Sequence, residues 1–184
     1  MNPVIELLQS RVSCPKLMEP APNQAELDQI MDCAMRAPDH ARLKPWRYYV
    51  VRGEALNKLG DVFAQVAQKD SCASADKIEK CRNMPSRAPM LIVAVCNPQE
   101  NPKVPSLEQF LAVGAGVQNI QLAINSLGYS SVWRTGDMVH APEVKKAFDV
   151  NEEGEIIAFL YVGTAQKVPA KPVVDASEYV KNWK

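Results

Sequence analysis

The sequence lacks the short motifs that identify the commonest nucleotide-binding and hydrolytic folds. It contains only eight glycines in 184 residues. Gly114-Ala115-Gly116 begins a G-x-G pattern, but position 119 is Asn119 and no strand pattern precedes it, so the dinucleotide fingerprint fails. There is no G-K-[ST] of a P-loop and no G-x-S-x-G of a serine hydrolase. A phosphate-bearing ligand would therefore be held mainly by side chains.

The cysteine and histidine residues also lack the spacings that are typical of disulfide frameworks and metal sites. The five cysteines form an odd number without any C-x-x-C pair, which argues against a disulfide framework and against a zinc knuckle. A cytoplasmic location is the simplest setting for such thiols. His40 and His140 are the only histidines, and neither has a second ligand at a metal-site spacing, so we expect no metal.

The formal net charge is zero, and no basic block of the nucleic-acid type occurs. Apolar runs stay below the roughly 18 residues of a membrane span, and the N-terminus shows no signal-peptide pattern. We therefore expect neither nucleic acid nor membrane as a partner.

Helix and strand patterns alternate along the chain and predict an α+β fold in a single domain, residues 1–184. Apolar or β-branched runs predict strands at 47–51, 90–96, 130–133 and 156–162. Cap residues predict helices that begin at Asn2-Pro3 and at Asn23, and a short helix is expected at 142–148. The polar stretch 69–80 is expected to be a surface helix with loops, or a mobile flap.

The longest helix is predicted from Pro105 to Gly128, and its apolar residues leave only a narrow polar strip. Such a helix is expected to be buried. Gly114 and Gly116 in its middle each cost about 1 kcal/mol relative to Ala, which the close approach of another helix, for example from a second subunit, would offset. Gly128 is expected to cap its C-terminus.

Three arginines are the candidates for holding an anionic ligand: Arg11, Arg36 and Arg134. Arginine suits this task because its planar fork binds phosphate oxygens in pairs. The loop from Arg36 through His40 to Trp46 gathers charged and titratable groups between a helix and a strand, where functional residues are often found. These residues alone do not separate a binding site from a charged surface.

Four segments together resemble the nitroreductase family, and the resemblance is closest to the small members of that family. They are Arg11-Val12-Ser13, Arg36-Ala37-Pro38-Asp39-His40 with Pro45-Trp46, Gly128 followed by Trp133-Arg134-Thr135-Gly136, and Leu160-Tyr161-Val162-Gly163-Thr164. The resemblance covers nearly the whole chain. It implies a nitroreductase-like fold with a mixed central sheet flanked by helices, and an intertwined homodimer that packs along the long central helices with FMN at the subunit interface.

The resemblance also assigns site residues. The cofactor-binding residues that it implies are Arg11, Val12, Ser13, Arg36, His40, Trp133, Arg134 and Thr135, with His40 approaching from the opposite subunit. It places the nicotinamide nucleotide, NADH or NADPH, at Ala123, Ile124, Asn125, Ser126, Leu127 and Gly128. The family usually reads Arg-Arg-Ser where this chain has Val12, and Lys16 replaces an arginine, so phosphate affinity is expected to be lower.

The function that the resemblance implies is transfer of electrons from NAD(P)H through FMN to a nitroaromatic, a quinone or a similar small-molecule acceptor. The flavin carries the chemistry, so no protein acid, base or nucleophile is assigned. Two alternatives stay open: an FMN carrier or redox sensor without turnover, and a thiol-based redox protein that uses Cys14 or Cys33. The C-terminal tail, about residues 166–184, is expected to be extended and to pack on the partner subunit or to remain loose.

Overall fold

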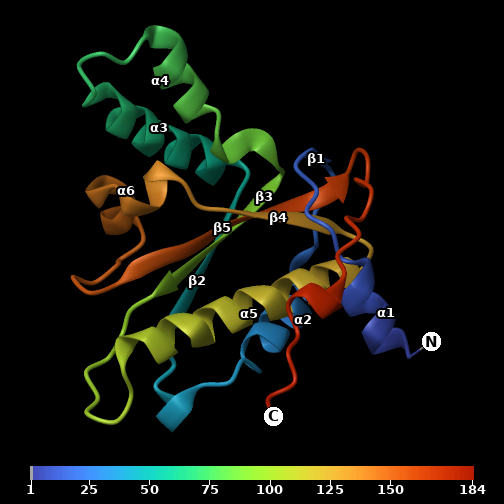
Figure 1. Cartoon of the computed structure of the whole chain (residues 1–184). Coiled ribbons are helices and arrows are strands. Elements are labelled where there is room, and N and C mark those ends of the chain that lie inside the picture. The colour runs from blue at the N-terminus through green and yellow to red at the C-terminus, as the bar shows by residue number, and fades with distance from the viewer. Residues whose placement is uncertain (1) are drawn as a thin grey trace.

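The computed structural model describes residues 2–184 and builds them around one antiparallel sheet (Figure 1). The strands are β1 (Leu17–Met18), β2 (Trp46–Arg52), β3 (Met90–Cys96), β4 (Ser130–Arg134) and β5 (Glu155–Ala165). β5 pairs with β3, which pairs with β2, while β4 and the short β1 also pair with β5. All four predicted strands are confirmed, and β1 was missed.

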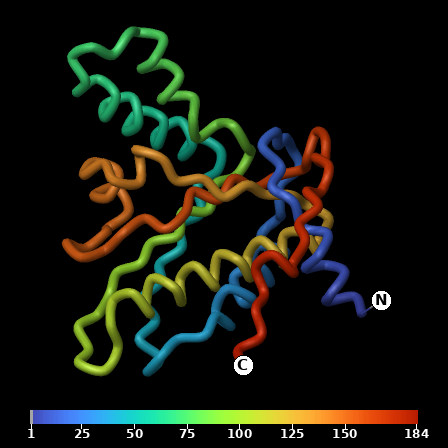
Figure 2. Tube along the Cα trace, viewed as in Figure 1, coloured from blue at the N-terminus to red at the C-terminus, as the bar shows by residue number. Residues whose placement is uncertain are grey.

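The prediction of a mixed sheet is wrong for the described chain, because every strand pairing in residues 2–184 is antiparallel. Between β2 and β3 the chain forms a helical hairpin of α3 (Glu54–Gln68) and α4 (Ala75–Arg82). Figure 2 shows this hairpin leaving the sheet and returning to it. A hairpin of two helices brings the chain back to the end of the sheet that it left, so β3 runs opposite to β2.

The sheet is covered by helices on both faces. Successive side chains of β3 point to opposite faces of the sheet. On one face, Leu91, Val93 and Val95 pack with α3 and with α6 (Pro142–Ala147). Met90 and Ile92 pack on the opposite face with α2 (Gln24–Ala34) and α5 (Ser106–Ser126). This two-sided burial explains why the β3 sequence is continuously apolar.

Local capping signals are confirmed by the structure. The Asn2 side chain accepts a hydrogen bond from Val4 N at 2.9 Å at the start of α1 (Pro3–Ser10). Asn23 and Glu26 form a reciprocal capping box at the start of α2. Gly128 follows α5 with φ +84°, the left-handed conformation expected after a helix. The polar stretch 69–80 contains the start of α4 and adjoining turns, as predicted.

The long helix α5 is buried on one face only. Val113, Val117, Ile120 and Ile124 are fully inaccessible, whereas Leu107 and Leu111 are 67% and 64% exposed. The prediction of a helix buried all round therefore holds for half of its surface. Hydrophobic periodicity shows which faces of a helix are apolar, but not whether the covering element belongs to the same chain.

The close approach predicted at the α5 glycines occurs at Gly116, and the contacts come from the same chain. A Cβ atom at Gly116 would collide with the Tyr48 hydroxyl and would lie 3.5 Å from Ala34 O at the end of α2. Gly114 is not constrained in this way, because its nearest neighbour would be the Trp133 ring at 3.9 Å. Gly116 is thus required by packing on β2 and α2.

Gly116→Ala is expected to destabilise the protein by about 1–3 kcal/mol, because overpacking a closed core displaces its neighbours. Tyr48→Phe removes the oxygen that the new methyl group meets, so the double variant should recover most of this loss. Tyr48→Phe alone should be neutral or slightly stabilising, since the buried Tyr48 hydroxyl has no hydrogen-bond partner among the described residues. Urea unfolding of the three variants measures the effect, and a double variant no more stable than Gly116→Ala would contradict it.

The C-terminal segment after β5 is mostly irregular, with one short 3₁₀ turn, Ala176–Glu178, and it exposes large apolar side chains. Val173 is 97% exposed and Trp183 is fully exposed.

Within residues 2–184 the structure has no helix long and apolar enough to cross a bilayer.

Candidate functional site

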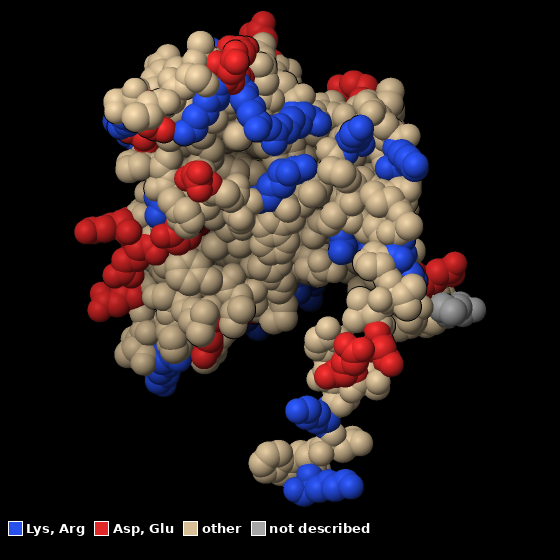
Figure 3. Space-filling view, turned by 45° about the horizontal axis from the view of Figure 1, so that its top comes forward, with Lys and Arg blue, Asp and Glu red and all other residues tan. Residues whose placement is uncertain are grey.

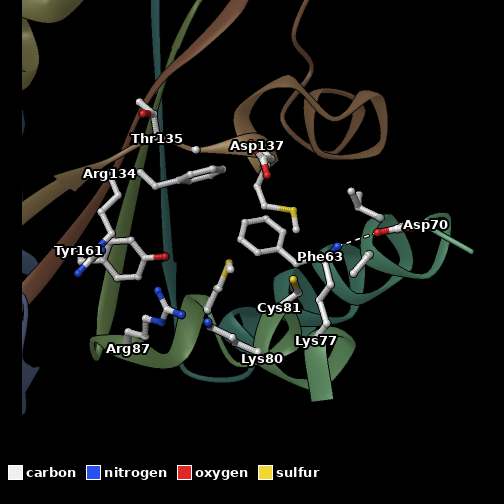
Figure 4. A pocket seen from close by; sticks show the side chains of 16 residues that line it. Phe63, Asp70, Lys77, Lys80, Cys81, Arg87, Arg134, Thr135, Asp137 and Tyr161 are labelled. Carbon is white, nitrogen blue, oxygen red and sulfur yellow. Dashed lines mark hydrogen bonds and ion pairs between the residues drawn. The ribbon is translucent and has the colours of Figure 1, made fainter. Parts of the chain in front are cut away.

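A cavity of about 690 Å³ opens between the α3–α4 hairpin and the sheet. Its walls include Arg134 at the end of β4, Thr135 and Gly136 just after it, and Phe159 and Tyr161 from β5. Figure 4 shows Tyr161 on one side of this cavity and Phe63 and Cys81 of the helical hairpin on the other. The predicted Trp-Arg-Thr-Gly segment therefore ends at a ligand-sized cavity.

The two central residues of that segment face opposite sides of the sheet. Arg134 lies on the cavity side, where its Cζ atom is 5.9 Å from the centroid of the Tyr161 ring. Trp133 points to the α5 side, 37% exposed, and its indole Nε1 donates a hydrogen bond to Ile157 O at 3.0 Å. Side chains alternate along a strand, so adjacent residues of β4 cannot line one cavity together.

Arg11 carries a buried cationic donor that an anion would satisfy. It ends α1, is half-buried, and its Nη1 atom is buried without a hydrogen-bond partner among residues 2–184. A buried cationic donor left unpaired is costly, so such a group indicates a ligand. A hydrogen bond of 3.0 Å from Cys14 N to Ser131 O holds the segment that follows Arg11 beside β4.

Val12 and Ser13, which complete the first predicted segment, differ in burial. Val12 is partly buried and packs against the core on the α3 side of the sheet, and Ser13 is exposed. Val12 thus contributes apolar packing where the family usually has an arginine, and Arg11 is the one cation of this segment.

His40 lies in a second, smaller hollow of about 360 Å³, together with Glu108 and with Leu111 and Ala115 of α5. Its Nδ1 atom is 2.7 Å from a Glu108 carboxylate oxygen. Residues 41, 42 and 44 after it have positive φ, although none is glycine, so this loop holds a strained conformation. His40 is thus held beside the exposed apolar face of α5 and outside the larger cavity.

Arg36 lies at the end of α2, is exposed, and lines neither hollow. In the described chain it joins no ion pair. The structure of one chain therefore does not bring Arg36 or His40 together with Arg11 and Arg134.

The residues predicted to hold the nicotinamide nucleotide form the last turn and cap of α5. Ile124 is fully buried, and Ala123 and Leu127 pack against the same core. The Ser126 hydroxyl donates to Ala123 O at 2.8 Å, the Asn125 amide lies 3.5 Å from the Ser10 hydroxyl, and Gly128 is exposed. A helix C-terminus also carries partial negative charge, which disfavours a pyrophosphate. The structure gives this assignment no support, and it stays a prediction.

Several cavity residues were missed from the sequence: Phe63, Lys77, Lys80, Met84, Arg87 and Tyr161. The one available signal was that Lys77 and Lys80 lie three residues apart and so share a helix face. Burial raises the pKa of Tyr161, and the Arg87 and Arg134 cations partly oppose this rise, which places both guanidinium groups near the phenol.

The cysteines named as candidate thiols differ in access. Cys14 is only 1% exposed, whereas Cys33 is exposed on α2. In residues 2–184 no cluster of three histidine, cysteine or acidic side chains is placed to hold a metal ion. The fold and the site thus define an α+β protein with a partly aromatic, cation-lined cavity and, outside the lining of that cavity, a buried cationic donor.

Comparison with known proteins gives the class. Residues 8–164 match the model of the Nitroreductase family. YdjA of Escherichia coli K12, assigned as a NAD(P)H nitroreductase, is 40% identical over 163 residues, which cover 88% of each chain. The chain therefore belongs to the nitroreductase family, and it is an oxidoreductase.

Solved structures agree on the fold. A nitroreductase-like protein from Bacillus cereus superposes with a TM-score of 0.83 at 24% identity, over 98% of this chain and 96% of that one. A nitroreductase from Bacteroides fragilis with bound FMN gives a TM-score of 0.76 at 16% identity over the whole of both chains. These likenesses confirm the nitroreductase-like α+β architecture that the sequence motifs predicted.

Proposed function

We propose that this chain is an FMN-dependent oxidoreductase that passes electrons from NAD(P)H to a nitroaromatic, a quinone or a similar electrophilic acceptor. The observation that carries the proposal is the buried, unpaired Arg11 Nη1 atom, which is not part of the lining of the cavity that Arg134 and Thr135 line. The segment that follows Arg11 is bonded to β4 through Cys14 N and Ser131 O. Because Arg11 does not line that cavity, its anion site and the ring-sized cavity are separate. Such a pair of sites suits an elongated cofactor with an anion at one end and a flat ring at the other.

The residues present fit FMN in both parts. Arg11 would bind the phosphate through its guanidinium fork, and the hydroxyl of the exposed Ser13 is near it in sequence for a further hydrogen bond. Arg134 and Thr135 would lie against the ring system, and the Arg134 cation would stabilise negative charge on a reduced ring. When bound, FMN would supply the hydride and electron transfer that no side chain of this cavity provides.

The active unit that we propose is a homodimer. Large apolar side chains are exposed on three elements, and contiguous exposed apolar surface marks an interaction site. They are Val4, Ile5 and Leu8 of α1, Leu107 and Leu111 of α5, and Val173, Val174, Tyr179, Val180 and Trp183 of the tail. Packing of two α5 helices across this face would carry His40, which borders it, toward the cofactor of the other subunit, and the tail would cover a partner.

Anaerobic spectroscopy tests the proposed activity. The purified protein should bind FMN, NADH or NADPH should bleach the flavin band, and a nitroaromatic or quinone should restore it. Bound flavin that neither nucleotide reduces would contradict the enzyme and favour a carrier or sensor. Failure to bind FMN at all would contradict the proposal as a whole.

A further inference from the structure

The larger cavity carries an excess of positive charge. Four cations, Lys77, Lys80, Arg87 and Arg134, face two carboxylates, Asp70 and Asp137, which leaves a surplus of two positive charges. Lys77 Nζ and Asp70 form an ion pair at 2.7 Å, so that pair is internally neutral. In residues 2–184 no ion pair joins the other three cations to a carboxylate. Lys and Arg side chains gather on this side of the molecule (Figure 3).

The free cations come from three different elements and converge on one region. Lys80 comes from α4, Arg87 from the turn Pro85–Arg87, and Arg134 from β4. Figure 4 shows the three side chains on the side of the cavity where Tyr161 lies. Like charges brought together without a counterion repel each other, so a bound anion would stabilise this arrangement.

The rest of the cavity wall is apolar and aromatic. Phe63 and Phe159 meet edge to face with ring centroids 5.5 Å apart and lie at the base of this wall, only 1% and 2% exposed, while Met84 is the more accessible apolar side chain. Aromatic and thioether groups favour contact with a flat ring. The cavity therefore combines a surface for an aromatic ring with donors for an anion.

The proposed cofactor does not account for all of these cations. Its phosphate is assigned to Arg11, which does not line this cavity, and its ring to Arg134 and Thr135. Lys80 and Arg87 remain for a second ligand. Both are exposed, so a ligand that exchanges with solvent can reach them.

We propose that the electron acceptor of this site is an aromatic molecule that bears a carboxylate. Its ring would lie against the Phe63 and Phe159 wall, and Lys80 and Arg87 would bind its carboxylate. This inference rests on the proposed function and names its substrate class. For a nitroarene carboxylate, one NAD(P)H and one proton convert the nitro group to a nitroso group with release of NAD(P)⁺ and one water, so two electrons are transferred.

The test compares 4-nitrobenzoate with its neutral analogue 4-nitrobenzamide on the FMN-loaded protein. The ratio of their kcat/KM values is measured for the wild type, Lys80→Met, Arg87→Met and the double variant. Taking the ratio between variants cancels the intrinsic reactivity of each acceptor. The ratio should fall about tenfold or more when both cations are removed, because contacts to a charged group are strong. Lys146→Met, an exposed lysine of α6 outside both hollows, is the matched control and should leave the ratio unchanged.

A binding measurement separates this inference from the proposed function. Calorimetry of benzoate against benzamide needs no turnover, and benzoate should lose affinity in the Arg87→Met and Lys80→Met variants. If the benzoate affinity and the acceptor ratio both stay constant, the inference is wrong even where NAD(P)H reduces the flavin. A loss of FMN affinity without a change in benzoate affinity would assign the two cations to the cofactor, and this result would also overturn the inference. If the flavin is never reduced, the proposed function is wrong, but benzoate binding still shows whether Lys80 and Arg87 bind a carboxylate.

Discussion

Arg11→Ala is expected to raise the FMN dissociation constant about thirtyfold or more. Removing one partner of a buried, hydrogen-bonded charge pair costs about 2–5 kcal/mol, and each 1.4 kcal/mol is a factor of ten in affinity. Arg11 should have an unusually large share of the phosphate contact, because Val12 supplies no side-chain donor at the next position. Fluorescence titration of the apoprotein with FMN measures the constant directly.

The apoprotein provides the discriminating control. The Arg11 Nη1 atom has no partner in the described chain, so Arg11→Met should not lower the melting temperature and could raise it. Arg11→Lys keeps the charge but loses the planar fork, and its affinity should fall between those of wild type and Arg11→Ala. Arg52→Ala, at the exposed end of β2, should leave FMN affinity unchanged. If Arg11→Ala binds FMN as tightly as wild type, the phosphate role is wrong.

Leu111→Glu is expected to weaken the homodimer by about a hundredfold or more. Leu111 is 64% exposed in the single chain, so a charge at this position costs the monomer little, whereas it would be buried where two α5 helices pack. Interface residues of this kind are worth about 2–4 kcal/mol when they are disrupted. Sedimentation velocity over a dilution series measures dissociation, and FMN retention should fall with it.

The control for that variant carries the same change of charge on another helix. Gln65 is exposed on α3, away from the apolar face, and Gln65→Glu should leave the dimer intact. A Leu111→Glu protein that remains dimeric at the lowest concentrations would place the subunit contact elsewhere. A wild-type protein that is monomeric with FMN bound would remove the need for a partner altogether.

Much of the fold could be predicted because its signals are local. Asn23 and Glu26 specify a helix start within four residues, and the run from Met90 to Cys96 is apolar because both faces of β3 are covered. The antiparallel direction of the strands could not be predicted in the same way. It depends on the α3–α4 hairpin returning the chain beside β2, which is a property of tertiary packing.

The site was predicted less completely for a related reason. The motif that contains Arg134 and Thr135 does lead to a cavity, but nothing local in the sequence marks Lys80 and Arg87 until the fold brings them to the cavity that Tyr161 lines. The sequence named Arg11, yet only the structure shows that one of its nitrogens is buried without a partner. Burial and the absence of a counterion are long-range properties that no local pattern contains.

Mixing two inactive variants tests most directly whether two copies of the chain form each flavin site together. One variant is Arg11→Ala, and the other is His40→Ala. After the two proteins are unfolded together and refolded at equal concentrations, half of the dimers should be mixed. Each mixed dimer should contain one intact site, so about a quarter of all sites should bind FMN and be reduced by NAD(P)H. Flavin binding that stays at the level of the separate variants would contradict a site shared between subunits.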